Sequence, residues 1–269
     1  MIDGIVMIGG GLAAGLFGSL VGLGGGILIV PLLTLVFDLP LLTAIGVSLV
    51  CVIVTSGAAA GVYLERRVAN LRLGMTLELF TAIGALGGAT IAFLIPERAL
   101  AALFGGLLVY VAVTMARGRD REEETAALPA DEPPSTTFAA SLSASGYRVR
   151  NVGLGAVGSV FAGVTSALLG IGGGTVKVPV MHVLMGVPLR VATATSNLMI
   201  GITASSGAIV YLLRGGIDPY VAAPTAVGVF LGASLGSRIA HRIDLRVLRL
   251  LFVAVLIYTA WQMLQRAVA

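Results

Sequence analysis

Long apolar runs separated by short polar stretches dominate the chain. They cover about residues 2–36, 41–64, 73–95 and 99–116, and a similar set of runs starts at residue 152. Each run approaches or exceeds the roughly 20 residues that a helix needs to cross hydrocarbon. Backbone groups in lipid must be satisfied within their own segment, and an outer-membrane barrel would show short alternating strands instead. The pattern therefore predicts an all-α polytopic membrane protein.

The chain also contains two copies of one unit. GLGGGILIVP (Gly22–Pro31) aligns without gaps on GIGGGTVKVP (Gly170–Pro179), and the same offset of 148 residues aligns Tyr110 with Tyr258 near the end of each copy. Between the copies the sequence is polar and has too little apolar surface to repay the entropy of ordering. We expect a first membrane repeat at 1–116, a polar cytoplasmic linker at 117–150 and a second membrane repeat at 151–269.

The first apolar run of each copy is too long for one straight span. Residues 4–36 would form a helix of roughly 50 Å, against a hydrocarbon thickness of about 30 Å. Consecutive glycines favour a break, because they lose most entropy when a helix orders them. If this segment enters and returns, each copy crosses three further times, which is an odd number. The two repeats should then be inverted in the membrane.

The distribution of basic residues supports the inverted arrangement. Of the 17 basic residues, it places thirteen on the cytoplasmic face, three outside and Lys177 within the membrane. Eight plain spans in parallel repeats would place ten basic residues on the cytoplasmic face and six outside, which fits the excess of basic residues in cytoplasmic loops less well. We therefore expect the linker in the cytoplasm and both termini on the opposite face of a cell (inner, cytoplasmic) membrane.

Composition excludes several other classes of protein. Only 11% of residues are charged, against roughly 25% in soluble domains. The net charge of +4 is spread over loops, so it indicates orientation and not a nucleic-acid partner. The single Cys51 allows no intrachain disulfide or cysteine metal cluster, and neither an HExxH nor a Gly-x-Ser-x-Gly motif is present. We expect no enzyme activity, metal or cofactor.

The two glycine triplets are the first candidates for a binding site. A break in a membrane helix can present the free N–H groups of a half-helix to an anion. Glycine also lets neighbouring membrane helices pack closely, which would be a purely structural role. The triplets are Gly24, Gly25 and Gly26 in the first repeat and Gly172, Gly173 and Gly174 in the second.

Ionisable residues in the apolar runs form the second group of candidates. Lys177 stands where the first repeat has Ile29, and charged residues inside a membrane are usually functional. The alternative is a lysine whose long stem reaches the interface. Glu78 and His182 are further buried candidates, as proton carriers or as partners of the lysine, although a satisfied structural role is also open.

Hydroxyl and amide side chains form the third group. Ser48 and Ser196 occupy equivalent positions of the two repeats, and Thr195 and Asn197 flank the second serine. Such donors suit oxyanions. A hydroxyl in a membrane helix can instead bond the carbonyl four residues earlier, so each of them alone is ambiguous.

The glycine-rich repeats, the polar linker and the segment ATATSN (Ala192–Asn197) together resemble the sulfite exporter TauE/SafE family over essentially the whole chain. The resemblance implies a permease for sulfite, sulfonates or related sulfur oxyanions. We expect alternating access, with the anion bound near the midplane between the repeats. An anion channel, a proton-coupled uptake permease and a scaffold or sensor are the alternatives. The expected partners are the small anion and the lipid bilayer, and a homodimer is left open.

Charge alone suggests the driving force. An inside-negative potential pushes an uncoupled anion outward with about 2.3 kcal/mol per charge per 100 mV. Export then needs no coupled ion, whereas uptake would need a titratable group. We therefore expect electrogenic, export-capable transport.

Overall fold

The structure, a computed structural model, describes residues 2–21, 25–65, 69–117, 142–143, 147–239 and 245–268, which are helical with short connections and contain no strand. The expected all-α class is confirmed. The first repeat contains α1 (Ile2–Val21), α2 (Gly26–Leu35), α3 (Leu41–Glu65), α4 (Leu71–Ala92) and α5 (Glu97–Arg117). The second contains α7 (Val152–Leu169), α8 (Gly174–Pro179), the π-helix η1 (Val180–Leu184), α9 (Leu189–Leu213), α10 (Pro219–Ile239) and α11 (Leu245–Val268).

The described helices are built for a lipid environment. Six segments are long and apolar enough to cross a bilayer: Leu71–Ala92, Glu97–Ala116, Val152–Leu169, Val191–Leu213, Pro219–Gly236 and Leu250–Ala267. Their outward faces are apolar; on α4, for example, Leu79 is 68% exposed and Ile83 65% exposed. Exposed faces of this kind suit lipid and not water, so the chain is a multi-pass membrane protein.

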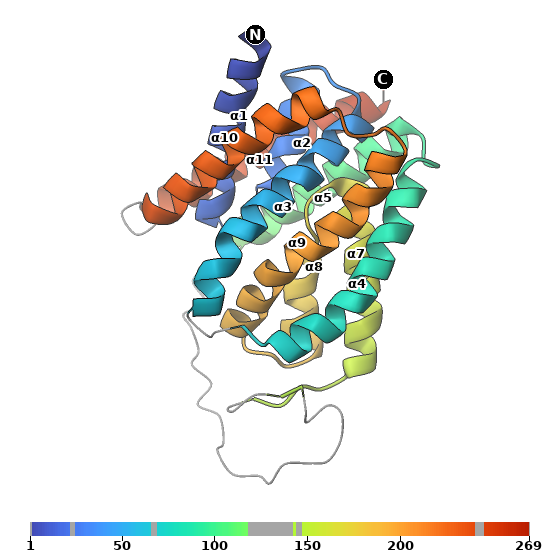
Figure 1. The fold of residues 1–269 in the computed structure, drawn as a ribbon, viewed down its shortest axis with the longest axis vertical. Helices are drawn as coiled ribbons and strands as arrows, with labels where there is room; N and C mark the ends of the chain where they lie inside the picture. The colour runs from blue at the N-terminus through green and yellow to red at the C-terminus, as the bar shows by residue number, and fades with distance from the viewer. Residues whose placement is uncertain are drawn as a thin grey trace.

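Each repeat begins with a broken segment, as the glycines predict. The ten residues of α2 span about 15 Å, which is half of the hydrocarbon thickness. Figure 1 shows that α2 leads back toward the end of the molecule where α1 starts, and that α8 and η1 lead back toward the start of α7. Gly25, with φ 74°, lies at the first break, whereas Gly24 lies outside the described residues.

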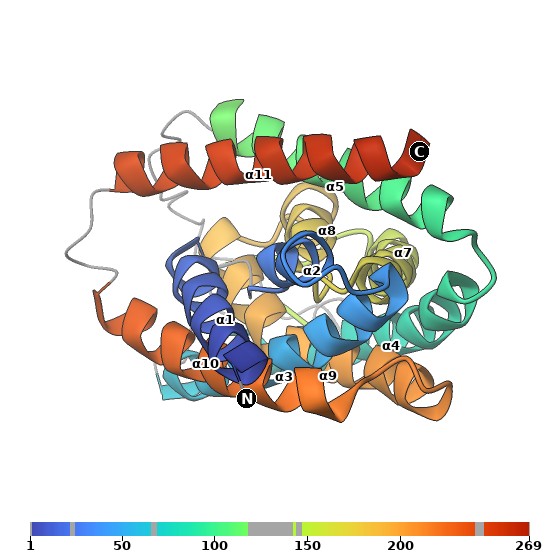
Figure 2. The same ribbon diagram turned by 90° about the horizontal axis from the view of Figure 1, so that it is seen from above.

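The two repeats interlock through glycine-mediated helix pairs. The first helix of each repeat packs against a helix of the other, α1 against α10 and α7 against α4. A Cβ at Gly15 would collide with Val229 O, and a Cβ at Gly84 would collide with Val160 O. Such close backbone approach is typical of membrane helix interfaces. Helices α3 and α9 also pack against each other, while α5 and α11 lie side by side along one edge of the bundle (Figure 2).

Matching helices of the two repeats run in opposite directions. In Figure 1, α3 descends while α9 ascends, and both termini lie at the upper end. The inverted repeat and its orientation in a bilayer stay predictions. The repeat and linker boundaries also stay predictions, and most of the linker lies outside the described residues.

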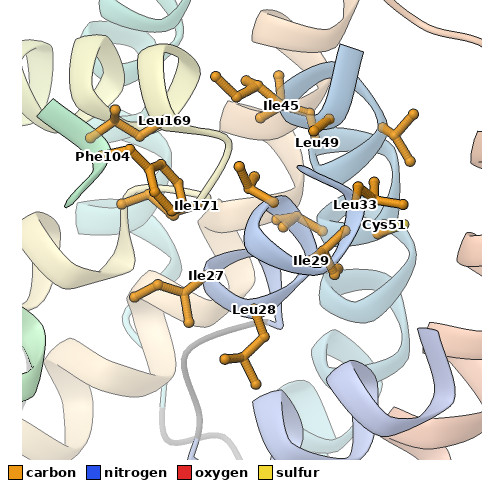
Figure 3. Packing of buried hydrophobic residues seen from close by; sticks show 14 of the residues in the cluster. Ile27, Leu28, Ile29, Leu33, Ile45, Leu49, Cys51, Phe104, Leu169 and Ile171 are labelled. Atoms are coloured by element: carbon orange, nitrogen blue, oxygen red, sulfur yellow. The ribbon is translucent and has the colours of Figure 1, made fainter. Parts of the chain in front are cut away.

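The apolar core surrounds the first broken segment. Ile27, Ile29 and Leu33 of α2 are fully buried against α3 and the segment that follows α7 (Figure 3). Burying each of these side chains contributes about 1.5–3 kcal/mol where it leaves water. The α2 segment is therefore held in place by packing, and the second break, near α8, is where polar groups gather.

Candidate functional site

The two glycine breaks meet at the centre of the molecule, and Ser48 joins them. Its hydroxyl lies 2.7 Å from Gly170 O and 3.2 Å from Gly26 O. A Cβ at Gly26 would lie only 2.6 Å from Gly170 O, so glycine is required there by the close approach of the two backbones. Ser48 was a candidate for substrate binding, and the structure engages its hydroxyl with the backbone of both breaks.

The second break has the opposite property, because hydroxyls around it lack partners. Among the described residues, the buried side-chain oxygens without a hydrogen bond are those of Ser166, Thr175 and Ser196. A Cβ at Gly173 would lie 3.5 Å from Ser166 Oγ, and one at Gly174 would lie 3.6 Å from Ser196 Oγ. The three hydroxyls thus surround the start of α8, and we call them the hydroxyl cluster.

The backbone at this break is shaped by glycine. The φ angles at this break are 68° at Gly170, 78° at Gly172 and 75° at Gly173, in the left-handed region that residues other than glycine rarely adopt. The three hydroxyls beside this backbone are donors of the kind that can bond the oxygens of a small oxyanion.

Ser48 and Ser196 therefore differ, although they are equivalent in the two repeats. Both are fully buried, with 0% exposure. Ser48 satisfies backbone carbonyls, whereas Ser196 has no partner in the structure. An unpaired buried hydroxyl costs about 1–3 kcal/mol, so a hydrogen-bonding partner at Ser196 would be stabilising.

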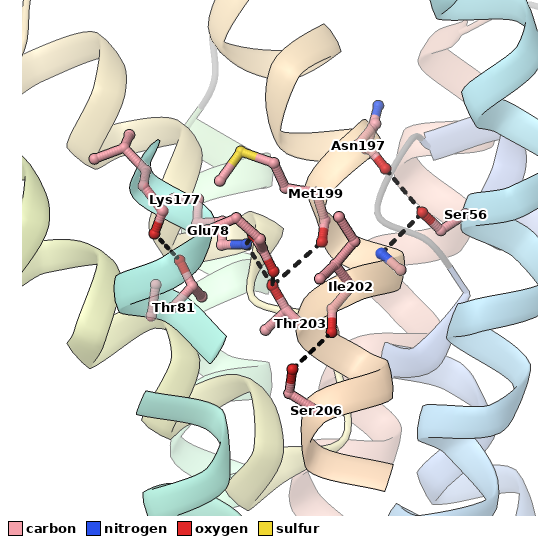
Figure 4. Close-up of polar contacts among 12 residues, drawn as sticks. Ser56, Glu78, Thr81, Lys177, Asn197, Met199, Ile202, Thr203 and Ser206 are labelled. Atoms are coloured by element: carbon pink, nitrogen blue, oxygen red, sulfur yellow. Dashed lines mark hydrogen bonds and ion pairs between the residues drawn. The ribbon is translucent and has the colours of Figure 1, made fainter. Parts of the chain in front are cut away.

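Next to the hydroxyl cluster, Lys177 forms a buried ion pair with Glu78. Lys177 Nζ lies 2.8 Å from Glu78 Oε2 and donates to Thr203 Oγ1 at 2.5 Å, and Thr203 donates to Glu78 Oε1 at 2.5 Å (Figure 4). The side chains of Lys177 and Glu78 are 1% and 4% exposed. We call these three residues the ionic triad. In this state Lys177 is not a free cation, because Glu78 is its partner, and a role of Glu78 in carrying protons stays a prediction.

Two neighbouring candidates hold helices together. Thr195 Oγ1 accepts the N–H of Asn70 at 2.9 Å, which fixes the start of α4. The backbone oxygen of Asn197 accepts from Ser56 at 2.9 Å, and the Ser56 hydroxyl in turn accepts the N–H of Gly201 at 2.9 Å, which links α3 to α9 (Figure 4).

Asn70 extends the anchor at the start of α4. Its amide donates to Leu142 O at 2.8 Å and to the Tyr147 hydroxyl at 2.7 Å. Tyr147 lies outside the spanning helices, and its partial burial raises the pKa of its hydroxyl. Thr195 thus belongs to a network that ties α4 to the segment before α7.

The expectation that His182 is buried is wrong. It lies on the exposed surface of η1, and its Nδ1 is 2.9 Å from Val187 O.

A cavity of about 540 Å³ lies away from the glycine breaks, between the ends of α2, α5 and α11, and is lined by Glu97, Arg98 and Arg266 among others. No group of three metal-binding side chains gathers in the described part of the chain.

Sequence reasoning missed Ser166, Thr175, Thr203 and Ser56. The signal for two of them lies in the differences between the repeats. Ser166 and Thr175 stand where the first repeat has Gly18 and Ile27. Polar residues gained by one copy only, as Lys177 is, mark the second break as the chemically specialised one.

In the described part of the chain, six segments long and apolar enough to cross a bilayer and the short helices α2 and α8 after the glycine breaks match the general plan of a membrane transporter. The model of the family described as sulfite exporter TauE/SafE matches residues 7–263, and the chain belongs to this family.

Curated relatives support the same class. The chain is 26% identical over 280 residues to the "Probable membrane transporter protein YunE" of Bacillus subtilis, covering 98% of each chain. It is 30% identical over 266 residues to a "Probable membrane transporter protein" of Xylella fastidiosa, covering 96% of this chain and 95% of the relative. No solved structure matches the chain significantly. The protein is a membrane transporter with a small-molecule substrate, not an enzyme.

Proposed function

We propose that the protein carries a small oxyanion across the membrane and binds it at the second glycine break. The observation that supports this most is the hydroxyl cluster of Ser166, Thr175 and Ser196, three buried side-chain oxygens without partners at or beside the second break. An oxyanion accepts hydrogen bonds through several oxygens at once, so it can bond more than one of these hydroxyls. The family name and the resemblance of the glycine-rich motifs favour sulfite or an organosulfonate as the anion.

Most residues named from the sequence keep a role in this proposal. Gly172, Gly173 and Gly174 shape the site, and Ser196 contributes a donor. The first break supports this site through Gly25, Gly26 and Ser48, because the two breaks contact each other there. Lys177 is held by Glu78 in this state, so we assign the initial binding of the anion to the hydroxyl cluster.

We propose alternating access between two inverted repeats. We take α1–α3 with α10 and α4 with α7–α9 as the moving parts, because the tightest pairs are α1 on α10 and α7 on α4. The two groups meet along α3 and α9, where Ser48 and Ser56 make their hydrogen bonds. Sliding at this contact would open the second break to one face or to the other. We assign the protein to the cytoplasmic membrane with the linker inside, as the basic residues favour.

Flux into proteoliposomes tests the proposal. Radiolabelled sulfite, methanesulfonate, sulfate and chloride would each be exchanged against the same unlabelled anion over a range of concentrations. The proposal predicts exchange of sulfite or methanesulfonate that saturates and is reduced in Ser196→Ala. Flux that rises without saturation would indicate a channel, and no flux for any anion in folded protein would contradict the proposal.

A further inference from the structure

The ionic triad is buried at a contact between the two repeats. Glu78 comes from α4 of the first repeat, and Lys177 and Thr203 come from α8 and α9 of the second. All three side chains bond one another, and each is at most 3% exposed as a residue. Removing two charges from water carries a large desolvation penalty, and the attraction within the ion pair offsets only part of it.

The repeat provides an internal control for the triad. At the offset of 148 residues, Lys177 corresponds to Ile29 and Glu78 corresponds to Ala226, while Thr203 corresponds to Thr55. The first repeat therefore packs its own broken segment with Ile29 fully buried and without an ion pair. The fold does not require the charges, so their presence in one repeat points to a function.

No other described charge faces the triad. The helices around it are α4, α7, α8, η1 and α9. Arg72 on α4 and His182 on η1 are exposed, and α7 carries no titratable side chain. Among the described side chains of these helices, Glu78 and Lys177 are the charges in the interior, and they neutralise each other.

Lys177 lies next to the hydroxyl cluster. It lies three residues after Gly174 and four after Gly173, the glycines beside Ser196 Oγ and Ser166 Oγ, and its N–H donates to Gly173 O at 3.0 Å. Helical side chains lean toward the N-terminal turn, so its stem is directed back toward the glycine break. A rotation of this stem is the movement that would let the ammonium exchange Glu78 for an anion at the cluster.

We propose that Glu78 is the proton-coupling group of this carrier, a role that rests on the proposed function. When a monoanion binds the hydroxyl cluster, Lys177 pairs with it, and two negative charges would then share one ammonium in low dielectric. Glu78 avoids this by taking a proton from the water on the open side, which forms its O–H bond. On the other side the anion leaves, the proton returns to water, and Lys177 pairs with Glu78 again.

One proton then crosses with each monoanion in the same direction, and no net charge moves. This differs from the uncoupled, electrogenic transport that charge alone suggested. Thr203 is a positioning residue here, because its hydroxyl donates to Glu78 and accepts from Lys177. Its equivalent Thr55 lies outside the triad and provides a matched control.

Proteoliposomes loaded with radiolabelled methanesulfonate, which stays a monoanion over the working pH range, test the coupling. With potassium and valinomycin clamping the potential, wild-type protein should accumulate the anion about tenfold per pH unit on the alkaline side. Changing the sign of the potential should not alter that ratio. Glu78→Gln should abolish the accumulation while retaining slower exchange, and Thr203→Val should weaken the pH response more than Thr55→Val does.

A second variant guards against failure to fold. Glu78→Ala with Lys177→Ile copies the first repeat, so it should fold and exchange the anion slowly without responding to pH. Accumulation that follows the pH gradient in folded Glu78→Gln, or wild-type exchange that follows only the potential, would overturn the coupling and leave the proposed function intact. No exchange by folded wild-type protein would overturn both.

Discussion

The equivalent serines Ser48 and Ser196 should respond oppositely to the same substitution. Ser48→Ala removes the hydrogen bond of 2.7 Å to Gly170 O and the weaker contact of 3.2 Å with Gly26 O. It leaves a buried carbonyl unpaired, which costs about 1–3 kcal/mol of stability. Ser196→Ala removes a hydroxyl that has no partner, so stability should stay the same or rise by about 1 kcal/mol.

The order reverses for transport. If the anion accepts a hydrogen bond from Ser196, its loss should cost about 1.5–3 kcal/mol, because bonds to charged groups are the stronger ones. That range corresponds to a roughly ten- to 150-fold higher half-saturating concentration. Ser48→Ala should change this concentration much less, because its hydroxyl is occupied by the backbone.

Two measurements on the same purified proteins check this pair. Thermal unfolding in detergent should rank Ser48→Ala below wild type and Ser196→Ala at or above it. Saturable anion exchange in liposomes should single out Ser196→Ala. If Ser196→Ala lost as much stability as Ser48→Ala and kept the wild-type affinity, the assignment of the hydroxyl cluster to the substrate would be refuted.

Three further predictions concern packing, anchoring and topology. Gly163→Ala should destabilise the protein by about 1–3 kcal/mol, because its Cβ would collide with the α4 backbone. Gly87→Ala should be neutral or stabilising by up to about 1 kcal/mol, because nothing lies within 4 Å of its Cβ. Thermal unfolding compares the two variants. Asn70→Ala should cost about 1–2 kcal/mol in the same assay, because α4 loses its cap, and equal stability would refute the anchor. In a cysteine-free background, an impermeant thiol reagent applied outside should modify a cysteine at position 2 and not one at position 120, and the reverse result would contradict the inverted topology.

The fold followed from local signals that are strong in a membrane. Runs of apolar residues fix the helices, and Gly25 and Gly173 fix the breaks, because a helix cannot continue cheaply through consecutive glycines. The contact between α1 and α10 could not be predicted, since it depends on which small residues face each other across the bundle. Gly15 is needed there, whereas Gly87 on another helix meets nothing.

The site was harder to predict than the fold. A serine in a membrane helix has the same local signature whether it bonds the backbone, as Ser48 does, or stays unpaired, as Ser196 does. Thr195 bonds the backbone at the start of α4, and Asn197 contacts α3 through its backbone oxygen, so a role of the Asn197 side chain in binding stays a prediction. His182 was placed wrongly because one apolar run does not show which face of a short helix is buried. Lys177 could be singled out from the sequence because charged residues are rare within apolar membrane segments.

A structure with a heavy analogue of the substrate tests the central claim most directly. Selenite has the pyramidal shape and the hydrogen-bond-accepting oxygens of sulfite, and its selenium scatters anomalously, so crystals soaked with it would show the anion as a single peak. The account predicts that peak within hydrogen-bond distance of Ser166 Oγ and Ser196 Oγ, and its loss in Ser196→Ala. A peak beside Arg98 and Arg266 in the distant cavity, with the hydroxyl cluster empty in protein that exchanges selenite, would contradict it.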